Sequence, residues 1–350
     1  MNCPFVSVII PVRNEEKHLA SCLRSFLDQT YPPNSFEIIV VDGRSSDMSR
    51  EIVKDFVQKF RYIHCLDNPK AIVPAGMNVG IKAASGEIII RADGHNVYPS
   101  DYIENSVKYL ARTGADNVGG PIITVPSGAA LTSRLVAAVL SNPFGVGDSR
   151  FRTTTAEGFV DTVPFGAFRR EIFDHVGLFN EKLVRNQDNE LNARIRKEGG
   201  KVYQTPLLTT EYHPSTSFNQ LLAQTLRNSQ WHVFSMEENI NSMSIRHFVP
   251  AAFVLGLLIL LCVIIVWNPA KLLLAGVLSL YLILGIYFSF HKSRQYGWVV
   301  CGMLPFACLC FHVVYGVGTL IGLRYLFKPP SLQPIRAGQP INLGNDYQSD

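Results

Sequence analysis

The chain has 350 residues, of which 47% are hydrophobic, and this length allows more than one domain. The hydrophobic content is high for a purely soluble protein, and the excess lies in three long apolar segments after Phe248, which predicts a membrane anchor. The net charge of +4 is modest, and Lys and Arg are dispersed rather than gathered into a basic stripe, so we expect no nucleic-acid partner.

The seven cysteines form no C-x-x-C pair, so we expect reduced thiols that act as small apolar residues. The N-terminus enters a strand pattern at Phe5 without a basic segment or a cleavage site, so we expect no signal peptide.

The first predicted unit is a strand, Val6–Pro11, followed by a helix that opens within Val12–Glu16 and has apolar residues at helical spacing as far as Leu27. A second strand, Phe36–Val41, ends in Asp42 and precedes a predicted helix over about Arg50 to Phe60. An aspartate at such a strand end can accept hydrogen bonds from a nucleobase or ribose, or it can simply end the strand. Asp47 stands where it could cap the helix.

The alternation of strands and helices continues after Phe60. Tyr62–Leu66 is a third predicted strand, and a helix over about Ile72 to Ala84 follows, with Gly86 in the position of a C-cap glycine. Because helices separate the strands, the pattern predicts an α/β fold with a mostly parallel sheet and right-handed crossovers.

The fourth predicted strand, within Gly86–Arg91, is an apolar run that ends next to Asp93 and His95. Open α/β sheets bind ligands at the carboxyl ends of their strands, and these two side chains offer one oxygen and one nitrogen to a divalent cation on a nucleotide diphosphate. The alternative is a turn in which Asp93 caps the backbone and His95 is merely exposed.

Four strings, in their order and spacing, resemble the family 2 inverting glycosyltransferases, which have a GT-A fold: Val6–Glu15, Val40–Asp47, Gly76–Gly80 and Gly86–Asp93. The resemblance implies a nucleotide-sugar donor and a divalent metal cofactor, with Asp93 at the start of the metal-binding Asp-x-Asp motif. It also implies that the donor pocket is lined or supported by Pro11, Asn14, Glu15, Asp42, Asp47, Asn78 and Asp93.

The chain departs from the family pattern at two places. Where the family commonly has Asp-Asp-Gly-Ser, this chain has Asp42-Gly43-Arg44-Ser45, so Asp42 alone is left for the base or ribose contact. His95 replaces the second aspartate of the metal motif, and an imidazole is a more natural ligand for Mn²⁺ than for Mg²⁺, which leaves the metal open between the two.

Two later segments also resemble the family. Val160–Phe168, which leads into a predicted helix over Arg169–Val176, is similar to the segment that brings backbone close to the donor sugar, with Gly166 permitting the approach. Asp188, at the start of a predicted helix, matches the catalytic base, since inverting transfer needs a carboxylate to take the acceptor proton. Without the resemblance, an acid at this position would be a helix cap favoured by the helix dipole.

Three further residues are assigned around this site. Gln187 and Glu190 are expected to support the base or the acceptor, although Glu190 could equally form a surface salt bridge. His213, after a final predicted strand over Val202–Pro206, is either a third metal ligand or a structural histidine.

The segments between these motifs carry less chemistry. The predicted helix over Tyr102–Arg112 and the strand end over Ala115–Gly120 are expected to be structural. The glycine-rich stretch Pro126–Thr155, with a predicted helix over about Leu131 to Leu140, is interpreted as a mobile acceptor-side element, or as plain turns.

Phe218–Met236 has an interrupted amphipathic pattern and predicts an interfacial helix that joins the catalytic domain to the bilayer, with Arg227 and Trp231 on the acceptor side. Processive polysaccharide synthases have Gln-x-x-Arg-Trp in this neighbourhood. Here Trp231 is displaced from that spacing, which argues against a processive synthase.

Phe248–Trp267 and Leu272–Phe290 are each long enough to span a membrane. Trp298–Leu323 contains Pro305 and is either a tilted third span or a broken, partly re-entrant one.

Charge favours a catalytic domain on the cytoplasmic side of the inner (plasma) membrane, because Lys292 and Arg294 follow the second span. Arg324, Lys328 and Arg336 conflict with three full spans, which would place them outside. The predicted domains are a GT-A domain over residues 1–215, an interfacial segment over 216–247, a membrane region over 248–326 and a disordered tail over 327–350.

We therefore predict a membrane-bound, metal-dependent inverting glycosyltransferase. It moves a sugar from a nucleotide donor, with UDP expected, to a lipid-linked saccharide acceptor on polyprenyl diphosphate, as in succinoglycan-type exopolysaccharide synthesis. The alternatives are a transferase that charges polyprenyl phosphate itself, a processive synthase, and an inactive membrane scaffold that binds sugar nucleotides.

Overall fold

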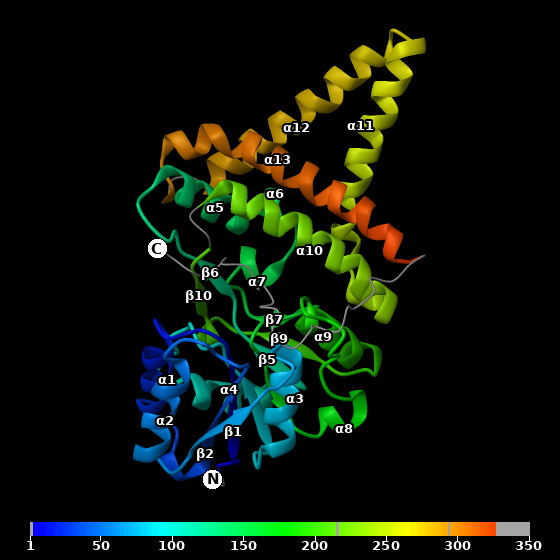
Figure 1. Ribbon diagram of the computed structural model, residues 1–350. Coiled ribbons are helices and arrows are strands. Elements are labelled where there is room, and N and C mark those ends of the chain that lie inside the picture. The colour runs from blue at the N-terminus through cyan, green and yellow to red at the C-terminus, as the bar shows by residue number, and fades with distance from the viewer. Residues whose placement is uncertain (1–2, 215–216, 293–294, 327–350) are drawn as a thin grey trace. The chain divides into compact units, whose positions relative to one another are not determined.

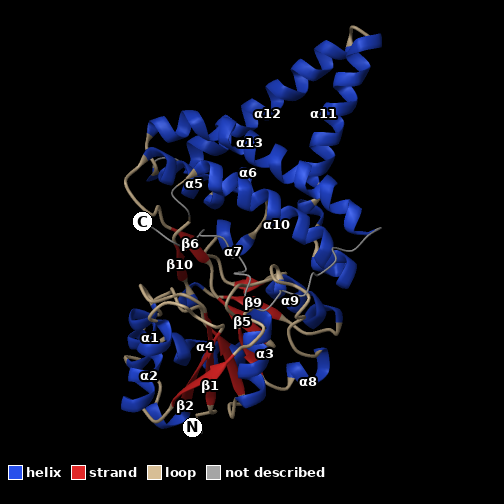
Figure 2. Ribbon diagram, in the orientation of Figure 1, coloured by secondary structure: helices blue, strands red, loops and turns tan. Residues whose placement is uncertain are grey.

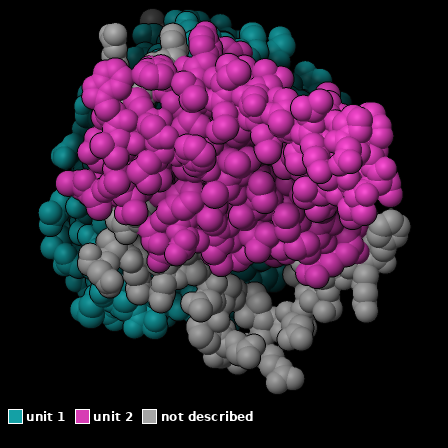
Figure 3. Space-filling model, turned by 90° about the horizontal axis from the view of Figure 1, so that it is seen from above, with its two compact units in different colours: residues 1–123, 154–211 teal, residues 124–153, 212–350 magenta. Residues whose placement is uncertain are grey.

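The structure is a computed structural model that describes residues 3–214, 217–292 and 295–326. The chain divides into two compact units (Figure 3). Residues 1–123 and 154–211 form the first, here called the sheet unit, and residues 124–153 and 212–350 form the second, here called the helical unit. The predicted disordered tail, 327–350, lies outside the described residues.

The sheet unit is built on an eight-stranded sheet in the order β3-β2-β1-β4-β8-β5-β9-β7. The strands β1 to β4 are parallel to one another, β5 is parallel to β9, and β8 and β7 are antiparallel to their neighbours. The predicted α/β fold with a mostly parallel sheet is therefore confirmed. The strands are β1 Val6–Val12, β2 Phe36–Asp42, β3 Ile63–Asp67, β4 Ile88–Arg91, β5 Asn117–Gly119, β7 Gly158–Phe159, β8 Ala167–Arg169 and β9 Val202–Gln204.

Helices cover both faces of this sheet (Figure 2). One hydrophobic core includes residues of α1, α2 and α4, and the other includes residues of α3, α8 and α9. Because both faces are buried, the central strands are continuous apolar runs, which is why their positions could be predicted. The helices are α1 Leu19–Leu27, α2 Ser49–Lys59, α3 Val73–Ala83, α4 Tyr102–Thr113, α8 Ile172–Val176 and α9 Gln187–Lys197.

Two local predictions were wrong. The first helix does not open within Val12–Glu16 but begins at Leu19, because Asn14 has a left-handed backbone with φ of 57° that a helix cannot include. Gly86 is not a left-handed C-cap, since α3 ends in an extended Ala84. The glycine is needed because a Cβ there would lie 2.5 Å from the backbone nitrogen of Ser7 in β1.

The helical unit contains α5 Leu131–Ser141, the short helices α6 Pro143–Val146 and α7 Arg150–Thr153, and the longer α10 Phe218–Glu238, α11 Val249–Val266, α12 Ala270–Lys292 and α13 Trp298–Gly322 (Figure 1). Its hydrophobic core joins α5 to α13 and to Leu221 of α10. Three segments are long and apolar enough to cross a membrane, namely 245–266, 270–290 and 298–322, close to the predicted spans. A separate two-stranded sheet pairs β6 Ile122–Thr124 with β10 Thr210–Tyr212, where the chain passes between the units in sequence.

Candidate active site

The parallel register brings the loops after β1, β2 and β4 to one edge of the sheet. Val12 at the end of β1 pairs with Asp42 at the end of β2, and Ile9 of β1 pairs with Arg91 at the end of β4. Because β1 lies between β2 and β4, the predicted site residues that follow these three strands belong to neighbouring loops.

The loop after β1 and the loop after β2 are locked together by hydrogen bonds. The Asn14 side chain accepts from the backbone N–H of Ser46 at 2.8 Å, and the Asn14 N–H donates to Ser45 Oγ at 3.0 Å. The Glu15 N–H donates to Ser49 Oγ at 2.7 Å. Asn14 and Glu15 therefore lie in a fixed two-loop platform at the edge of the sheet.

Asp47 ties the same loops to α2. Its carboxylate accepts from the backbone N–H of Ser49 and from that of Glu16, both at 3.0 Å. The N-cap residue of α2 is Met48, without a side-chain cap bond, so Asp47 is not the cap itself but bonds the first helical N–H from one position earlier. Its negative charge there favours the positive end of the helix dipole.

Asp42 is fully enclosed in this structure. Its side chain has no exposed surface, and its carboxylate lies 3.3 Å from Nε of Arg50 and accepts from the Ser45 N–H at 3.3 Å. Arg50 also forms an ion pair with Asp67. A nucleoside could reach the Asp42 carboxylate only if Arg50 moved, so the base or ribose contact stays a prediction.

Asp93 and His95 follow β4, and His95 contacts Glu15 in the loop after β1. The Asp93 N–H donates to the hydroxyl of Tyr98 at 2.7 Å, and Nδ1 of His95 lies 3.4 Å from the Glu15 carboxylate. Burial lowers the pKa of His95, but the hydrogen bond to Glu15 and the charges of Asp93 and Glu15 outweigh it, so the pKa is raised.

These residues fit a divalent cation as a partial set of ligands. A carboxylate that binds one imidazole nitrogen orients the ring and directs the other nitrogen toward a metal, and Glu15 has this relation to His95. In the described ranges, no group of three or more His, Cys, Asp or Glu side chains is close enough to hold a metal. A cation here would need ligands from a bound diphosphate as well.

Arg91, the last residue of β4, joins the metal motif to the predicted base. Its guanidinium donates to the Asp188 carboxylate, and it lies 3.3 Å from the Asp93 carboxylate. Only 5% of its side chain is exposed, and it lies 5.4 Å from the centre of the Phe165 ring. Sequence reasoning missed this residue, although a charge at the end of an apolar strand signals a buried partner.

Asp188 lies in the first turn of α9, two residues after the N-cap residue Asn186, which has a left-handed φ of 62°. Burial raises the pKa of the Asp188 carboxyl, the Arg91 guanidinium opposes that shift, and the Asp93 charge adds to it, so the pKa is raised. A carboxylate with a raised pKa is a better proton acceptor, which suits a general base.

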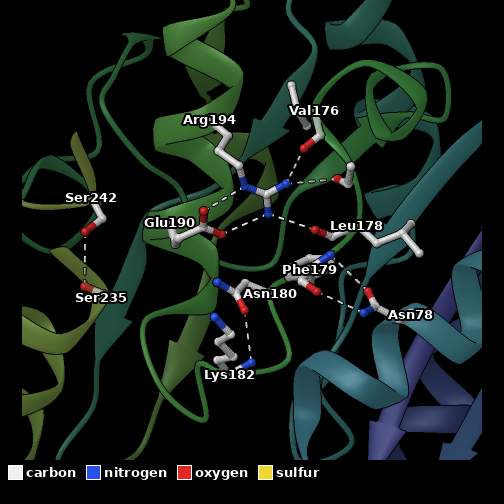
Figure 4. A network of polar contacts seen from close by, with 11 residues as sticks. Asn78, Val176, Leu178, Phe179, Asn180, Lys182, Glu190, Arg194, Ser235 and Ser242 are labelled. Carbon is white, nitrogen blue, oxygen red and sulfur yellow. Dashed lines mark hydrogen bonds and ion pairs between the residues drawn. The ribbon is translucent and has the colours of Figure 1, made fainter. Parts of the chain in front are cut away.

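Arg194, the partner of Glu190, and Asn78 both contact the segment after α8 (Figure 4). Glu190 forms a two-point ion pair with Arg194, at 2.7 and 2.9 Å, and Arg194 donates to the Leu178 carbonyl at 2.8 Å. Asn78 donates to the carbonyl of Phe179 and accepts from its N–H, both at 2.9 Å. Of the alternatives for Glu190, the ion pair is present, but it is buried rather than superficial.

The other predicted residues of the sheet unit lie within its packing. Gly166 accepts from the Arg91 N–H at 3.0 Å, and a Cβ at Gly166 would lie 2.0 Å from the Asn117 side chain, so the close approach seen here is to Asn117. Pro11 is within β1, next to Gly76 of α3, and Gln187 is buried at the start of α9.

Three predicted residues belong to the helical unit. His213 follows β10, and Arg227 and Trp231 are on α10, where Trp231 packs edge-on against Phe234. Their roles as a metal ligand and as acceptor-side residues stay predictions.

Residues 7–177 match the profile of Glycosyl transferase family 2. These residues form a family 2 glycosyltransferase domain, and all of them except residues 124–153 belong to the sheet unit. One relative of the whole chain is the succinoglycan biosynthesis protein ExoA of Rhizobium meliloti, 25% identical over 316 residues, which are 89% of this chain and 92% of that protein.

A second relative of the family 2 domain is a Methanococcus voltae dolichyl N-acetyl-alpha-D-glucosaminyl phosphate 3-beta-D-2,3-diacetamido-2,3-dideoxy-beta-D-glucuronosyltransferase. It is 29% identical over 230 residues, which are 63% of this chain and 71% of that protein. Among solved structures, the Pyrobaculum calidifontis mannosyltransferase PcManGT, in complex with GDP-Man and Mn²⁺, has a TM-score of 0.62 at 18% identity and covers 91% of this chain and 87% of that one. The predicted GT-A fold is thereby confirmed.

Proposed function

We propose that this protein is a membrane-bound, inverting glycosyltransferase that moves a sugar from a nucleotide donor to a lipid-linked saccharide. The observation that carries the proposal is the junction of β4 and α9, where Arg91 holds the predicted base Asp188 beside the predicted metal ligand Asp93. One guanidinium thus contacts both the predicted base and a predicted metal ligand, so the groups proposed for proton transfer and for departure of the diphosphate lie at one site.

In the proposed reaction, the oxygen of an acceptor hydroxyl attacks the anomeric carbon while its proton passes to the Asp188 carboxylate. The bond from that carbon to the nucleoside diphosphate breaks on the opposite face, which inverts the configuration. Asp93 and His95 would hold a divalent cation, which would supply positive charge to the departing diphosphate. Arg91 keeps Asp188 ionised and oriented, and Glu15 orients His95.

The names of similar proteins support the classes of donor, metal and acceptor in this proposal. PcManGT is described with GDP-Man and Mn²⁺, and the Methanococcus relative is named for transfer to a dolichyl-linked sugar phosphate. We extend these classes to this chain without choosing a sugar, and UDP stays the expected nucleotide.

The apolar helices support a membrane location for the acceptor. A lipid-linked saccharide is confined to the bilayer surface, so an enzyme anchored beside it meets its acceptor in two dimensions. We place the family 2 domain on the cytoplasmic side, since Lys292 ends α12 and Arg294 follows it in the sequence.

The test is nucleotide release by the full chain in lipid nanodiscs, with a panel of UDP- and GDP-sugars and Mn²⁺ or Mg²⁺. Three acceptor conditions are compared: no added acceptor, polyprenyl phosphate alone, and a membrane extract that contains lipid-linked saccharides. We expect release from one donor only with the extract, and its loss on chelation. Equal release with polyprenyl phosphate alone would contradict the proposed acceptor, and donor binding without release under any condition would favour an inactive scaffold.

A further inference from the structure

We propose that α13 lies along the membrane–water interface together with α5 and α10, and that only α11 and α12 cross the bilayer. The inference rests on the membrane anchoring within the proposed function and decides a question that length and apolar composition leave open, because all three helices are long enough to span.

The packing of α13 against α10 places both helices at the same depth in the membrane. A Cβ at Gly318 of α13 would lie 2.0 Å from Ser229 Oγ of α10, and a Cβ at Gly322 would lie 3.1 Å from the Cα of Gln230. The hydroxyl of Tyr315 lies 3.3 Å from Nδ1 of His232. These glycines allow the two backbones to run close together through the last turns of α13, so both helices lie at a similar depth.

The helix α10 is too polar to lie in hydrocarbon. Its exposed side chains include Asn219, Gln220, Arg227 and Glu237. A charged residue at the centre of a bilayer costs roughly 2.5–3.5 kcal/mol on insertion scales, and α10 carries charges of both signs with no apolar stretch of spanning length. The helix therefore belongs at the membrane surface, and α13 is held there with it.

The other face of α13 is an apolar stripe. Buried and exposed residues alternate at helical spacing, with Leu304, Ala307, Cys308 and Phe311 inside the core shared with α5. The exposed residues at the same spacing are Trp298, Val299, Met303, Phe306, Val317 and Ile321. A helix with one apolar face toward lipid and the other on protein suits the headgroup boundary.

The hairpin of α11 and α12 confirms that α13 does not run alongside these helices. A third span beside α11 and α12 would bury a row of side chains along the length of both helices. Between Leu255 and Leu280, however, Ala270 is the single buried residue. The buried positions cluster where α11 begins and α12 ends, for example Val254 and Gly285. A Cβ at Gly316 of α13 would lie 2.7 Å from Val254, and one at Gly285 would lie 3.0 Å from Pro305 of α13.

The helix α13 therefore crosses the hairpin at its base, and Figure 2 shows α11 and α12 extending beyond the layer that holds α5, α10 and α13. With 18 and 23 residues, α11 and α12 both fall within the roughly 17–25 residues of a membrane-spanning helix, so the chain can cross the bilayer and return.

Two spans resolve the charge conflict noted in the sequence. Arg246 precedes α11, Lys292 ends α12, and Arg324 follows α13, whereas Lys271 is the one Lys or Arg in the sequence between residues 247 and 291. With two spans, Arg246, Lys292 and Arg324 are all on the side of the hairpin base. By the positive-inside rule, this is the cytoplasmic side. Both ends of the chain are then cytoplasmic.

The first test is protease protection of the full chain in intact spheroplasts, with an epitope at each terminus and, in a second version, an epitope between Asn268 and Pro269. We expect external protease to remove the inserted epitope and neither terminal one. Digestion of the C-terminal epitope with the N-terminal one protected would mean three spans and overturn the inference alone. Protection of all three epitopes, with release of the protein by alkaline carbonate, would instead contradict membrane anchoring itself.

The second test measures depth with a nitroxide label in proteoliposomes. Labels are placed by Phe306→Cys in the middle of α13, Val317→Cys near its end and Ile259→Cys in the middle of α11, with the exposed Cys3, Cys262 and Cys310 replaced by Ser. We expect the labels at 306 and 317 to be equally shallow and the label at 259 to be deep. A label at 306 as deep as that at 259 would overturn the inference.

Discussion

The guanidinium of Arg91 donates to the carboxylate of Asp188, which joins the end of β4 to the first turn of α9. The same side chain lies 3.3 Å from Asp93, so one buried cation stands between two carboxylates of different predicted roles. Without it, the two acids would repel each other in a largely buried site.

Replacing Arg91 tests this relationship. Arg91→Met should lower kcat at least about tenfold, since Asp188 loses the partner that keeps it ionised and oriented. Arg91→Lys should retain more of the rate than Arg91→Met, because lysine keeps the positive charge but not the planar guanidinium that can bond two carboxylates. Steady-state nucleotide release measures kcat, and calorimetric titration of the donor shows that the site is still folded. A Met variant with unchanged kcat would remove Arg91 from the mechanism.

The activity should also depend on pH through Asp188. Its pKa is raised by burial, and only the carboxylate can accept a proton, so kcat/KM should fall in acid at a higher pH than an ordinary carboxyl would give. Because Arg91 lowers this pKa, the acid limb should move to still higher pH in Arg91→Met. A pH–rate profile of both proteins checks the direction, and a limb that moves toward acid in the variant would contradict the assignment.

The Glu190–Arg194 pair should act on stability rather than on the chemical step. Glu190 is buried, and Arg194 connects it to the backbone of Leu178, so Glu190→Gln should reduce the free energy of unfolding by roughly 3–5 kcal/mol, the usual cost of breaking a buried pair. Denaturant unfolding compares it with Glu198→Gln, a substitution of the exposed C-cap residue of the same helix, which should change little. A large loss of kcat with unchanged stability would instead favour a role for Glu190 at the acceptor.

His232 should make the helical unit sensitive to mild acid. Burial lowers the pKa of His232 to about 3, and the charges of His247 and Arg246 act in the same direction. The folded state therefore holds a neutral imidazole. The contribution of His232 to the free energy of unfolding is complete above the unfolded pKa of about 6.5 and is lost as the pH falls below that value. Thermal melting of the protein in detergent at pH 7.5 and 5 should show a smaller drop for His232→Gln than for the parent. An equal drop would assign the acid sensitivity elsewhere.

Much of the fold could be predicted because its signals are local and repeated. The strands β1, β2 and β4 are buried on both faces, so they are unbroken apolar runs, and the polar residues after them mark the ligand edge of a parallel sheet. The helix boundaries near Asn14 and Gly86 were wrong because they depend on a left-handed backbone and on a close approach to Ser7, which are tertiary constraints.

The chemistry of the site was less accessible from the sequence. Residue types identified Asp93, His95 and Asp188, but the partner that joins them, Arg91, becomes visible only when β4 and α9 are brought together across 97 residues of sequence. For Glu190, closeness in sequence to the predicted base was misleading, because its side chain pairs with Arg194 instead of entering the site.

The most direct test of the central claim is the Asp188→Asn variant, with Asp174→Asn as its control, because Asp174 is an exposed acid in the first turn of a neighbouring helix. Transfer to the lipid-linked acceptor is measured along with donor binding and thermal stability. We expect Asp188→Asn to lose about 10²–10⁴-fold in kcat while it binds the donor and stays folded, and Asp174→Asn to be unchanged. Full transfer activity in a folded Asp188→Asn protein would show that this carboxylate is not the base.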